Sequence, residues 1–94
     1  MNSDHPENII INSRRRLETK NRDILIRIDY LIHQSTFLGG KLRFKLENAF
    51  IDEVLSDLNI IYKIRGWQDV NIFNEHSENR VQTVIELTYN FNKV

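Results

Sequence analysis

The sequence predicts an α+β fold in which a helical hairpin packs on a C-terminal antiparallel β-hairpin. Two observations support this prediction. Apolar residues recur at helical spacing over residues 41–66, and they alternate with polar residues over residues 80–91. Because a two-stranded hairpin alone is only marginally stable, we expect a further strand to extend the sheet. An N-terminal strand at residues 8–11 or a second subunit would supply it.

The 94 residues make one small domain. Residues 1–8 are polar, contain Pro6 and offer nothing to bury, so we expect a disordered N-terminal tail. Residues 9–94 then form a single small α+β domain. A chain of this size buries only about 60–65% of the surface that its unfolded form exposes, so its core is modest. We therefore expect a homo-oligomer, most simply a dimer.

The first helix is expected to begin near Ser13, with Asn12 or Ser13 as its N-cap, and to reach about residue 33. A strand over residues 24–33 is the competing interpretation, because every second residue from Ile24 to Ile32 is apolar or aromatic and isoleucine favours strands. We prefer the helix, because Leu25 and Leu31 are apolar too and the charged residues 14–23 suit exposed first turns; the apolar stripe also repeats at spacings of three, four and seven. The stripe consists of Leu17, Ile24, Leu25, Ile28, Leu31 and Ile32.

A second helix is predicted over residues 41–66. Its basic last turn favours the negative end of the helix dipole, and Gly66 suits the position after a helix end. The apolar stripe consists of Leu42, Leu46, Phe50, Val54, Leu58 and Ile61. The opposite face is acidic and carries Glu47, Asp52, Glu53 and Asp57.

The C-terminal hairpin is predicted from two strand-like segments, residues 67–73 and 80–91, around the polar loop 74–79. The second segment alternates most sharply. One of its faces carries Val81, Thr83, Ile85, Leu87, Tyr89 and Phe91. We expect this face to meet the helices and the other face to meet water, with Val84 as the exception.

The composition excludes several classes of function. The chain has no cysteine, so it has no disulfide, no thiolate metal site and no cysteine catalysis. No phosphate-binding loop, metalloprotease motif or serine-hydrolase motif occurs, and the three histidines lack partners at ligand spacing. We expect no enzyme activity, no catalytic residue, no metal and no cofactor. No signal peptide or membrane span is evident, so we expect a soluble cytoplasmic protein that binds no membrane.

The net charge of zero conceals a strong segregation. Residues 13–45 hold nine basic and three acidic side chains, whereas residues 46–94 hold four basic and eight acidic ones. Such segregation is typical of an interaction surface, within the chain or with a partner. Three arginines at a helix start oppose the helix dipole, so we expect acidic side chains or a partner to offset them. The basic candidates for this interaction are Arg14, Arg15, Arg16, Lys20 and Arg22.

A second candidate contact lies where the second helix turns into the hairpin, at Tyr62, Arg65 and Trp67. An aromatic residue at such a corner usually seals the edge of the core. Tryptophan and arginine are also the side chains that most often dominate binding interfaces. We therefore keep both interpretations of this corner, with Arg65 beside Trp67 as the pair to test.

The sequence thus predicts a non-catalytic protein-interaction module: a small adaptor, an inhibitor or a structural accessory protein. A protein partner, bound through the charge-segregated helical surface, is the first expectation. The alternative is a nucleic-acid-binding regulator that uses the basic block Arg14–Arg16. Size, composition and lack of catalytic motifs are also typical of phage or mobile-element accessory proteins, for which the location would be the host cytoplasm. No family motif supports that source.

Overall fold

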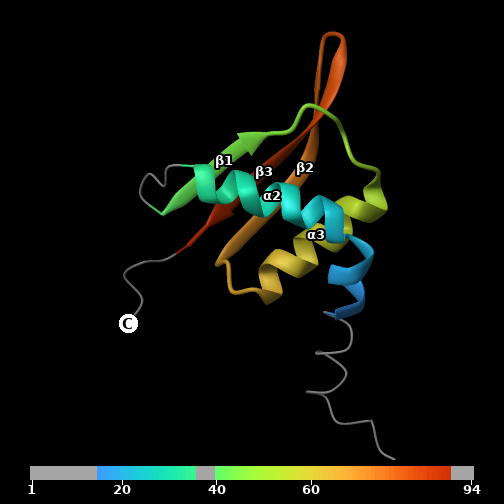
Figure 1. Ribbon diagram of the computed structural model, residues 1–94. Helices are drawn as coiled ribbons and strands as arrows, with labels where there is room; N and C mark the ends of the chain where they lie inside the picture. Colours follow the sequence, from blue (N-terminus) through green and yellow to red (C-terminus); the bar gives the residue numbers. More distant parts are fainter. Residues whose placement is uncertain (1–14, 36–39, 90–94) are drawn as a thin grey trace, which may run out of the picture.

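The computed structural model describes residues 15–35 and 40–89 (Figure 1). Residues 15–20 are helical and lead, through Asn21, into the first long helix. The elements that follow one another are α2 (Arg22–Gln34), β1 (Lys41–Lys45), α3 (Asp52–Ile64), β2 (Asp69–Ser77) and β3 (Arg80–Thr88). The chain is therefore α+β, as the sequence predicts. The segment 8–11, which we considered as an extra strand, lies outside the described residues.

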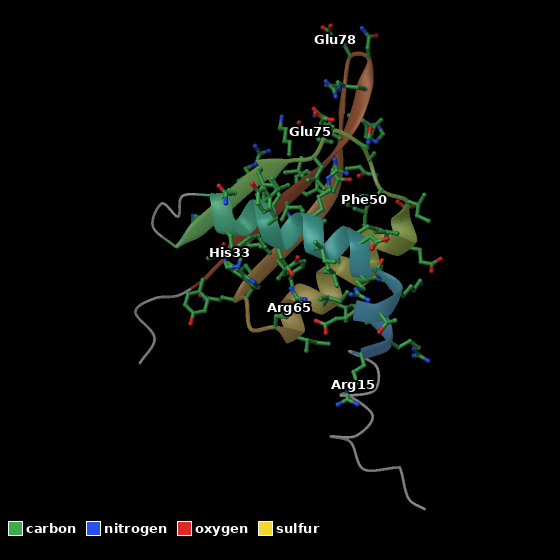
Figure 2. All side chains as sticks on the ribbon, viewed as in Figure 1. Arg15, His33, Phe50, Arg65, Glu75 and Glu78 are labelled. Atoms are coloured by element: carbon green, nitrogen blue, oxygen red, sulfur yellow. The ribbon has the colours of Figure 1, made fainter. Side chains whose placement is uncertain are left out.

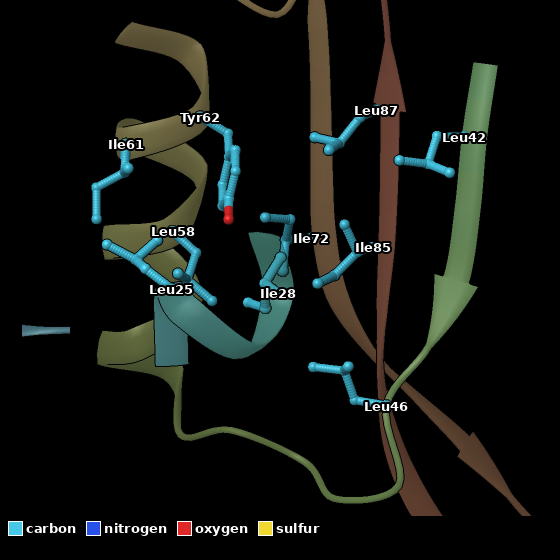
Figure 3. Packing of buried hydrophobic residues seen from close by; sticks show 10 residues of the cluster. All are labelled: Leu25, Ile28, Leu42, Leu46, Leu58, Ile61, Tyr62, Ile72, Ile85 and Leu87. Carbon is cyan, nitrogen blue, oxygen red and sulfur yellow. The ribbon is translucent and has the colours of Figure 1, made fainter. Parts of the chain in front are cut away.

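The three strands form one antiparallel sheet in the order β1-β3-β2, so the last strand of the sheet in sequence lies at its centre. Both long helices cover the same face of this sheet (Figures 1 and 3). The core lies between the helices and the sheet, as the close-up shows. Its buried members are Leu25, Ile28, Leu42, Leu46, Leu58, Ile61, Tyr62, Ile72, Ile85 and Leu87.

Helix α2 settles the ambiguity of residues 24–33 in favour of the helix. Leu25 and Ile28 of the predicted stripe are buried, and Ile24, Leu31 and Ile32 are partly buried against the core. The helix is preferred because it places all these apolar residues on one continuous face that reaches the core. A strand would bury only every second residue and would leave Leu25 and Leu31 on the opposite face from Ile28.

The second predicted helix is wrong over its first half. Residues 41–45 form the strand β1, and helix α3 begins only at Asp52. The error has a physical cause: apolar residues four positions apart, such as Leu42 and Leu46, satisfy a helical period and a period of two equally well. In 41–46 the intervening residues decide, because Lys41, Arg43 and Lys45 alternate with apolar ones. The third strand of the sheet therefore comes from between the two helices.

Helix α3 ends as predicted. Arg65 is the C-cap and Gly66 adopts a φ of 108°, a left-handed conformation that glycine tolerates best. The N–H of Trp67 donates to the carbonyl of Tyr62, and the N–H of Gly66 donates to that of Lys63. These two bonds define a Schellman motif, which satisfies carbonyls that the helix end would leave unpaired. The motif turns the chain sharply from α3 into β2.

The hairpin is longer than predicted. Strand β2 continues to Ser77, so most of the predicted loop 74–79 is strand and only residues 78–79 form the turn. Thr83, Ile85 and Leu87 on the predicted inner face are buried. The distal end of the hairpin projects beyond the helices (Figure 1), which is why Val81 remains partly exposed although it shares that face.

A buried polar contact fixes the loop between β1 and α3 to the sheet. The hydroxyl of Thr83 accepts a hydrogen bond from the N–H of Phe50 at 2.9 Å and donates to Asn74 Oδ1 at 2.7 Å. Asn74 Nδ2 in turn donates to the carbonyl of Phe50 at 2.9 Å. Because Thr83 is inaccessible to solvent, no water replaces these partners if they are lost.

Ion pairs cover the other face of the sheet. Val84 of β3 lies on the face away from the helices, yet it is inaccessible to solvent. Lys45 of β1 pairs with Glu75 of β2 at 2.7 Å, and Arg43 of β1 bonds to Glu86 of β3 at 2.8 Å. The long stems of such side chains shield apolar surface while their charged ends stay in water. The residues directly opposite Val84 are Lys45 on β1 and Phe73 on β2.

Thr83→Val is expected to lower the free energy of unfolding by about 1–3 kcal/mol, because it keeps the shape of the side chain but leaves the N–H of Phe50 without an acceptor and Asn74 Oδ1 without its donor. Urea unfolding measures the change. The matched control is Thr88→Val on the same strand, which should change stability by no more than about 0.5 kcal/mol. Equal effects of the two substitutions would contradict the anchoring role.

The ion pairs predict a dependence of stability on acid pH. The hydrogen bond from Lys45 lowers the pKa of Glu75 below its ordinary value of 4.5, and the bond from Arg43 lowers the pKa of Glu86 in the same way. A lowered carboxyl pKa stabilises the fold fully above the ordinary pKa, and this contribution is lost as the pH falls through the lowered value. Lys45→Met should therefore raise the pKa of Glu75 toward 4.5 in an NMR titration. Lys41→Met, on the same strand face, should leave that pKa unchanged.

Candidate functional site

The arginine block divides between the surface and the interior of the fold. Arg14 lies outside the described residues. Arg15, Arg16 and Arg22 are exposed, and none of them forms an ion pair with another described residue. Figure 2 shows Arg15 pointing away from the body of the fold. Within the part of the chain that the structure describes, these three guanidinium groups therefore have no acidic partner.

Lys20, by contrast, binds within the chain. Its ammonium group pairs with Glu53 of α3, and it lies 3.2 Å from Asp57 Oδ2. The hydrogen bonds to Glu53 and then to Asp57 raise the pKa of Lys20 above its ordinary value. The acidic face of α3 thus offsets one member of the basic block, as the charge segregation led us to expect.

Asn21 adds a buried contact at the same place. It is 3% exposed and occupies the junction between the helical residues 15–20 and α2. Its side-chain amide donates to the carbonyl of Leu17 at 2.9 Å and to Asp57 Oδ2 at 3.1 Å. Figure 1 shows the short helical segment turning away from the axis of α2 at this point. The amide therefore ties the bend to α3.

The corner at the end of α3 is a network within the chain. Arg65 bonds to Glu18 Oε2 at 3.0 Å and to Asp29 Oδ1 at 2.9 Å, and its guanidinium lies 5.1 Å from the centre of the Tyr62 ring. The Tyr62 hydroxyl donates to Asp29 Oδ1 at 2.7 Å. Burial, followed by the hydrogen bond to Asp29, raises the pKa of Tyr62 far above its ordinary value. The network fastens both helical segments to the end of α3.

Trp67 sits beside this network and is partly buried against the core. Its ring meets that of Tyr89 edge to face, with the centroids 6.0 Å apart and the planes at 77°. This geometry is favourable for two aromatic rings. Tyr62 itself is 1% exposed. Of the three corner residues that the sequence suggests, Tyr62 and Arg65 therefore have their contacts inside the domain, and Trp67 closes its edge.

Sequence reasoning missed two surface residues of α2. Ile26 and Tyr30 are 59% and 62% exposed, although both are large and mostly apolar. They lie four positions apart and therefore one above the other on the helix. A signal for them existed: once residues 22–34 are taken as a helix, Ile26 and Tyr30 fall off the buried stripe. Between them, Arg27 is exposed and forms no ion pair with the described residues. We call Arg22, Ile26, Arg27 and Tyr30 the outer face of α2.

A pocket adjoins the outer face of α2. It has a volume of about 340 Å³ and opens between α2 and the chain that follows β1. Tyr30, Leu31, Leu46 and Phe50 give it apolar walls, and its charged lining residues are Arg27, Lys45 and Glu47. Such a lining suits an apolar side chain with polar groups around it. No group of three histidine or acidic residues in 15–35 and 40–89 could hold a metal ion.

No helix within the described residues is long and apolar enough to cross a membrane. The chain matches no family model, and neither a curated protein nor a solved structure is significantly similar to it. Any function must therefore be argued from the surfaces described above.

The Arg65 network predicts a structural cost for its removal. Arg65→Met should lower the free energy of unfolding by about 1–2 kcal/mol, because Asp29 and Glu18 lose a partner in a partly buried place. Arg15→Met, at an exposed arginine, should change it by no more than about 0.5 kcal/mol. Thermal unfolding compares the two variants. If Arg65→Met is as stable as Arg15→Met, the network contributes nothing to the fold.

Proposed function

We propose that this protein is a non-catalytic protein-interaction module that binds an acidic surface of a partner protein through the outer face of α2. The observation that most supports this proposal is the exposed pair Ile26 and Tyr30. They are flanked by Arg22 and Arg27, which lack ion-pair partners among the described residues. Large apolar groups rimmed by unpaired charge are typical of protein-binding sites.

The energetics favour a protein partner. Burying a side chain such as Ile26 contributes about 1.5–3 kcal/mol. Tyrosine and arginine are among the residues that carry most binding energy at interfaces. Arg15 and Arg16, on the adjoining helical segment, would speed the approach of an acidic partner by long-range attraction. Lys20 contributes little to this attraction, since Glu53 and Asp57 already neutralise it.

The proposal includes the setting of the protein. We infer a small adaptor, inhibitor or structural accessory protein that works in the cytoplasm, because the chain has no cysteine. We also infer a homodimer, since a domain of this size has a modest core. If a phage or mobile element encodes the protein, the cytoplasm is that of its host.

The alternative is a nucleic-acid-binding regulator. The exposed arginines on one helical stretch, Arg15, Arg16, Arg22 and Arg27, favour it, since each could neutralise a phosphate. Two observations weigh against it. The net charge of the chain is zero, and a phosphate backbone would leave Ile26 without a use.

Ile26→Ser combined with Tyr30→Ser should abolish capture of the partner by the immobilised full chain, because it removes the apolar centre of the interface. Arg22→Glu combined with Arg27→Glu should weaken capture at least about tenfold, through repulsion of an acidic surface. Both variants should unfold within about 0.5 kcal/mol of the unaltered protein, since the sites are exposed. Arg80→Glu near the hairpin tip is the matched control and should bind normally. Undiminished capture by both double variants would refute the proposal.

Salt dependence separates the two functions. Light scattering after size exclusion, with and without a short DNA or RNA duplex, should show a mass that nucleic acid leaves unchanged at physiological salt. If the four arginines instead neutralise phosphates, a complex should form, and the slope of log K against log salt should be about −3 to −4. Each arginine removed should then reduce that slope by about one. That outcome would replace the proposed function by the alternative.

A further inference from the structure

The two edges of the sheet differ. At the edge formed by β2, the side-chain amide of Asn59 on α3 forms hydrogen bonds with both backbone groups of Ile72. The N–H of Ile72 donates to Asn59 Oδ1 at 3.1 Å, and the carbonyl of Ile72 accepts from Asn59 Nδ2 at 3.0 Å. Helix α3 therefore closes this edge at the middle of the strand, where a further strand would need both groups.

The edge formed by β1 is not paired with any segment in residues 15–35 and 40–89. Tyr89 N–H donates to the carbonyl of Gly40 and Leu46 N–H donates to that of Thr83, both at 2.8 Å, so even-numbered residues of this stretch turn their backbone groups toward β3. Successive residues of a strand direct these groups to opposite sides. The backbone N–H and carbonyl groups of Lys41, Arg43 and Lys45 therefore point away from the sheet. No described residue bonds to them.

The side chains of β1 alternate between the two faces of the sheet. Lys41, Arg43 and Lys45 lie on the face away from the helices, and all three are exposed. Phe44, which is partly buried, lies on the face toward the helices. The pocket of about 340 Å³ begins at the end of β1, with Tyr30 of α2 in its wall. A strand added at this edge would have basic neighbours on one face and an apolar pocket on the other.

A second copy of β1 does not suit this edge. In a symmetric antiparallel pair centred on Arg43, Lys41 would face Lys45 of the other copy, and the two arginines would face each other. Like charges directly opposite one another destabilise paired strands. An acidic strand has the complementary charge. Glu75 of β2 and Glu86 of β3, the carboxylates that pair with Arg43 and Lys45, both reach these cations from the inner side of β1, and no acidic group of the described residues pairs with them from the outer side.

We propose that the outer edge of β1 binds an extended acidic segment of the partner protein as a fourth strand of the sheet. The carboxylates of this segment lie beside Lys41, Arg43 and Lys45, and an apolar side chain enters the pocket next to Tyr30. Backbone hydrogen bonds then supply affinity, and the alternating side chains supply specificity. This inference rests on the proposed function, because it states how an acidic protein partner would bind.

The probe is a seven-residue peptide, Asp-Ile-Glu-Val-Asp-Leu-Glu with blocked ends, added to the full ¹⁵N-labelled chain. Binding should shift the amide signals of Lys41, Arg43 and Lys45 and slow their hydrogen exchange, because they gain partners. Methylation of the peptide nitrogens tests the backbone directly. In an antiparallel pair, methylation at the acidic residues should weaken binding about tenfold or more, whereas methylation at the apolar residues should not. A parallel pair would exchange the two results and would equally support strand addition.

Substitution of β1 provides a second test. Arg43→Pro removes an N–H that points away from the sheet, a position where edge strands tolerate proline, and it should abolish peptide binding. Arg43→Ala is the control for the lost side chain and should retain the shifts at Lys41 and Lys45, with affinity lowered by about tenfold at most. If Arg43→Pro fails to fold, the methylated peptides still decide.

Three outcomes overturn strand addition: no shift at any amide, equal affinities of the two methylated peptides, or binding to Arg43→Pro as tight as to Arg43→Ala. Shifts confined to Ile26, Tyr30 and their neighbours on α2 would also overturn it. That last result would leave the proposed function intact, since an acidic segment would then bind the outer face of α2 alone. Binding by the outer face of α2 alone is recognised in the same way if the serine variants of α2 lose partner capture while the peptide shifts no amide signal of β1.

Discussion

The central strand β3 is the constraint on which the other elements depend. Thr83, Val84 and Ile85 are consecutive and all inaccessible to solvent, so this strand is covered on both faces although the helices cover only one. Ile85 faces the helices, Val84 lies on the other face between Lys45 and Phe73, and Thr83 holds the loop that leads to α3. Strands β1 and β2 pair with β3 and not with each other. Removing β3 would therefore leave the helices without a sheet to cover.

Patterns with a single period were predictable from the sequence. The alternation of β3 and the glycine that ends α3 indicate their structures correctly, because each follows from local geometry. The stretch 41–51 was not predictable in this way, since its spacing of four satisfies both a helix and a strand. Over 41–46 the alternation of Lys41, Arg43 and Lys45 with apolar residues favours the strand, and pairing with β3, about 40 residues away, fixes it. No local pattern records which strand is the partner.

The candidate site was predictable only in outline. The charge segregation correctly suggested that α3 offsets part of the basic block, which Lys20 and Asp57 do. Which cations remain exposed depends on contacts between residues more than 30 positions apart, such as that of Arg65 with Asp29. Ile26 and Tyr30 were visible in the sequence as residues off the buried stripe, but only after the helix was certain. Exposure, unlike periodicity, requires knowledge of what covers a face.

The position of β3 at the centre of the sheet also shapes how the domain forms. Arg43 and its partner Glu86 are 43 positions apart, so β1 has nothing to pair with until the segment of β3 has been synthesised. The helices and β2 can form earlier, yet their apolar faces stay exposed until that strand is inserted. Domains dominated by such distant pairings fold more slowly than those built from local contacts. During synthesis on the ribosome this chain therefore remains open to proteases and to aggregation until almost all of its described part exists.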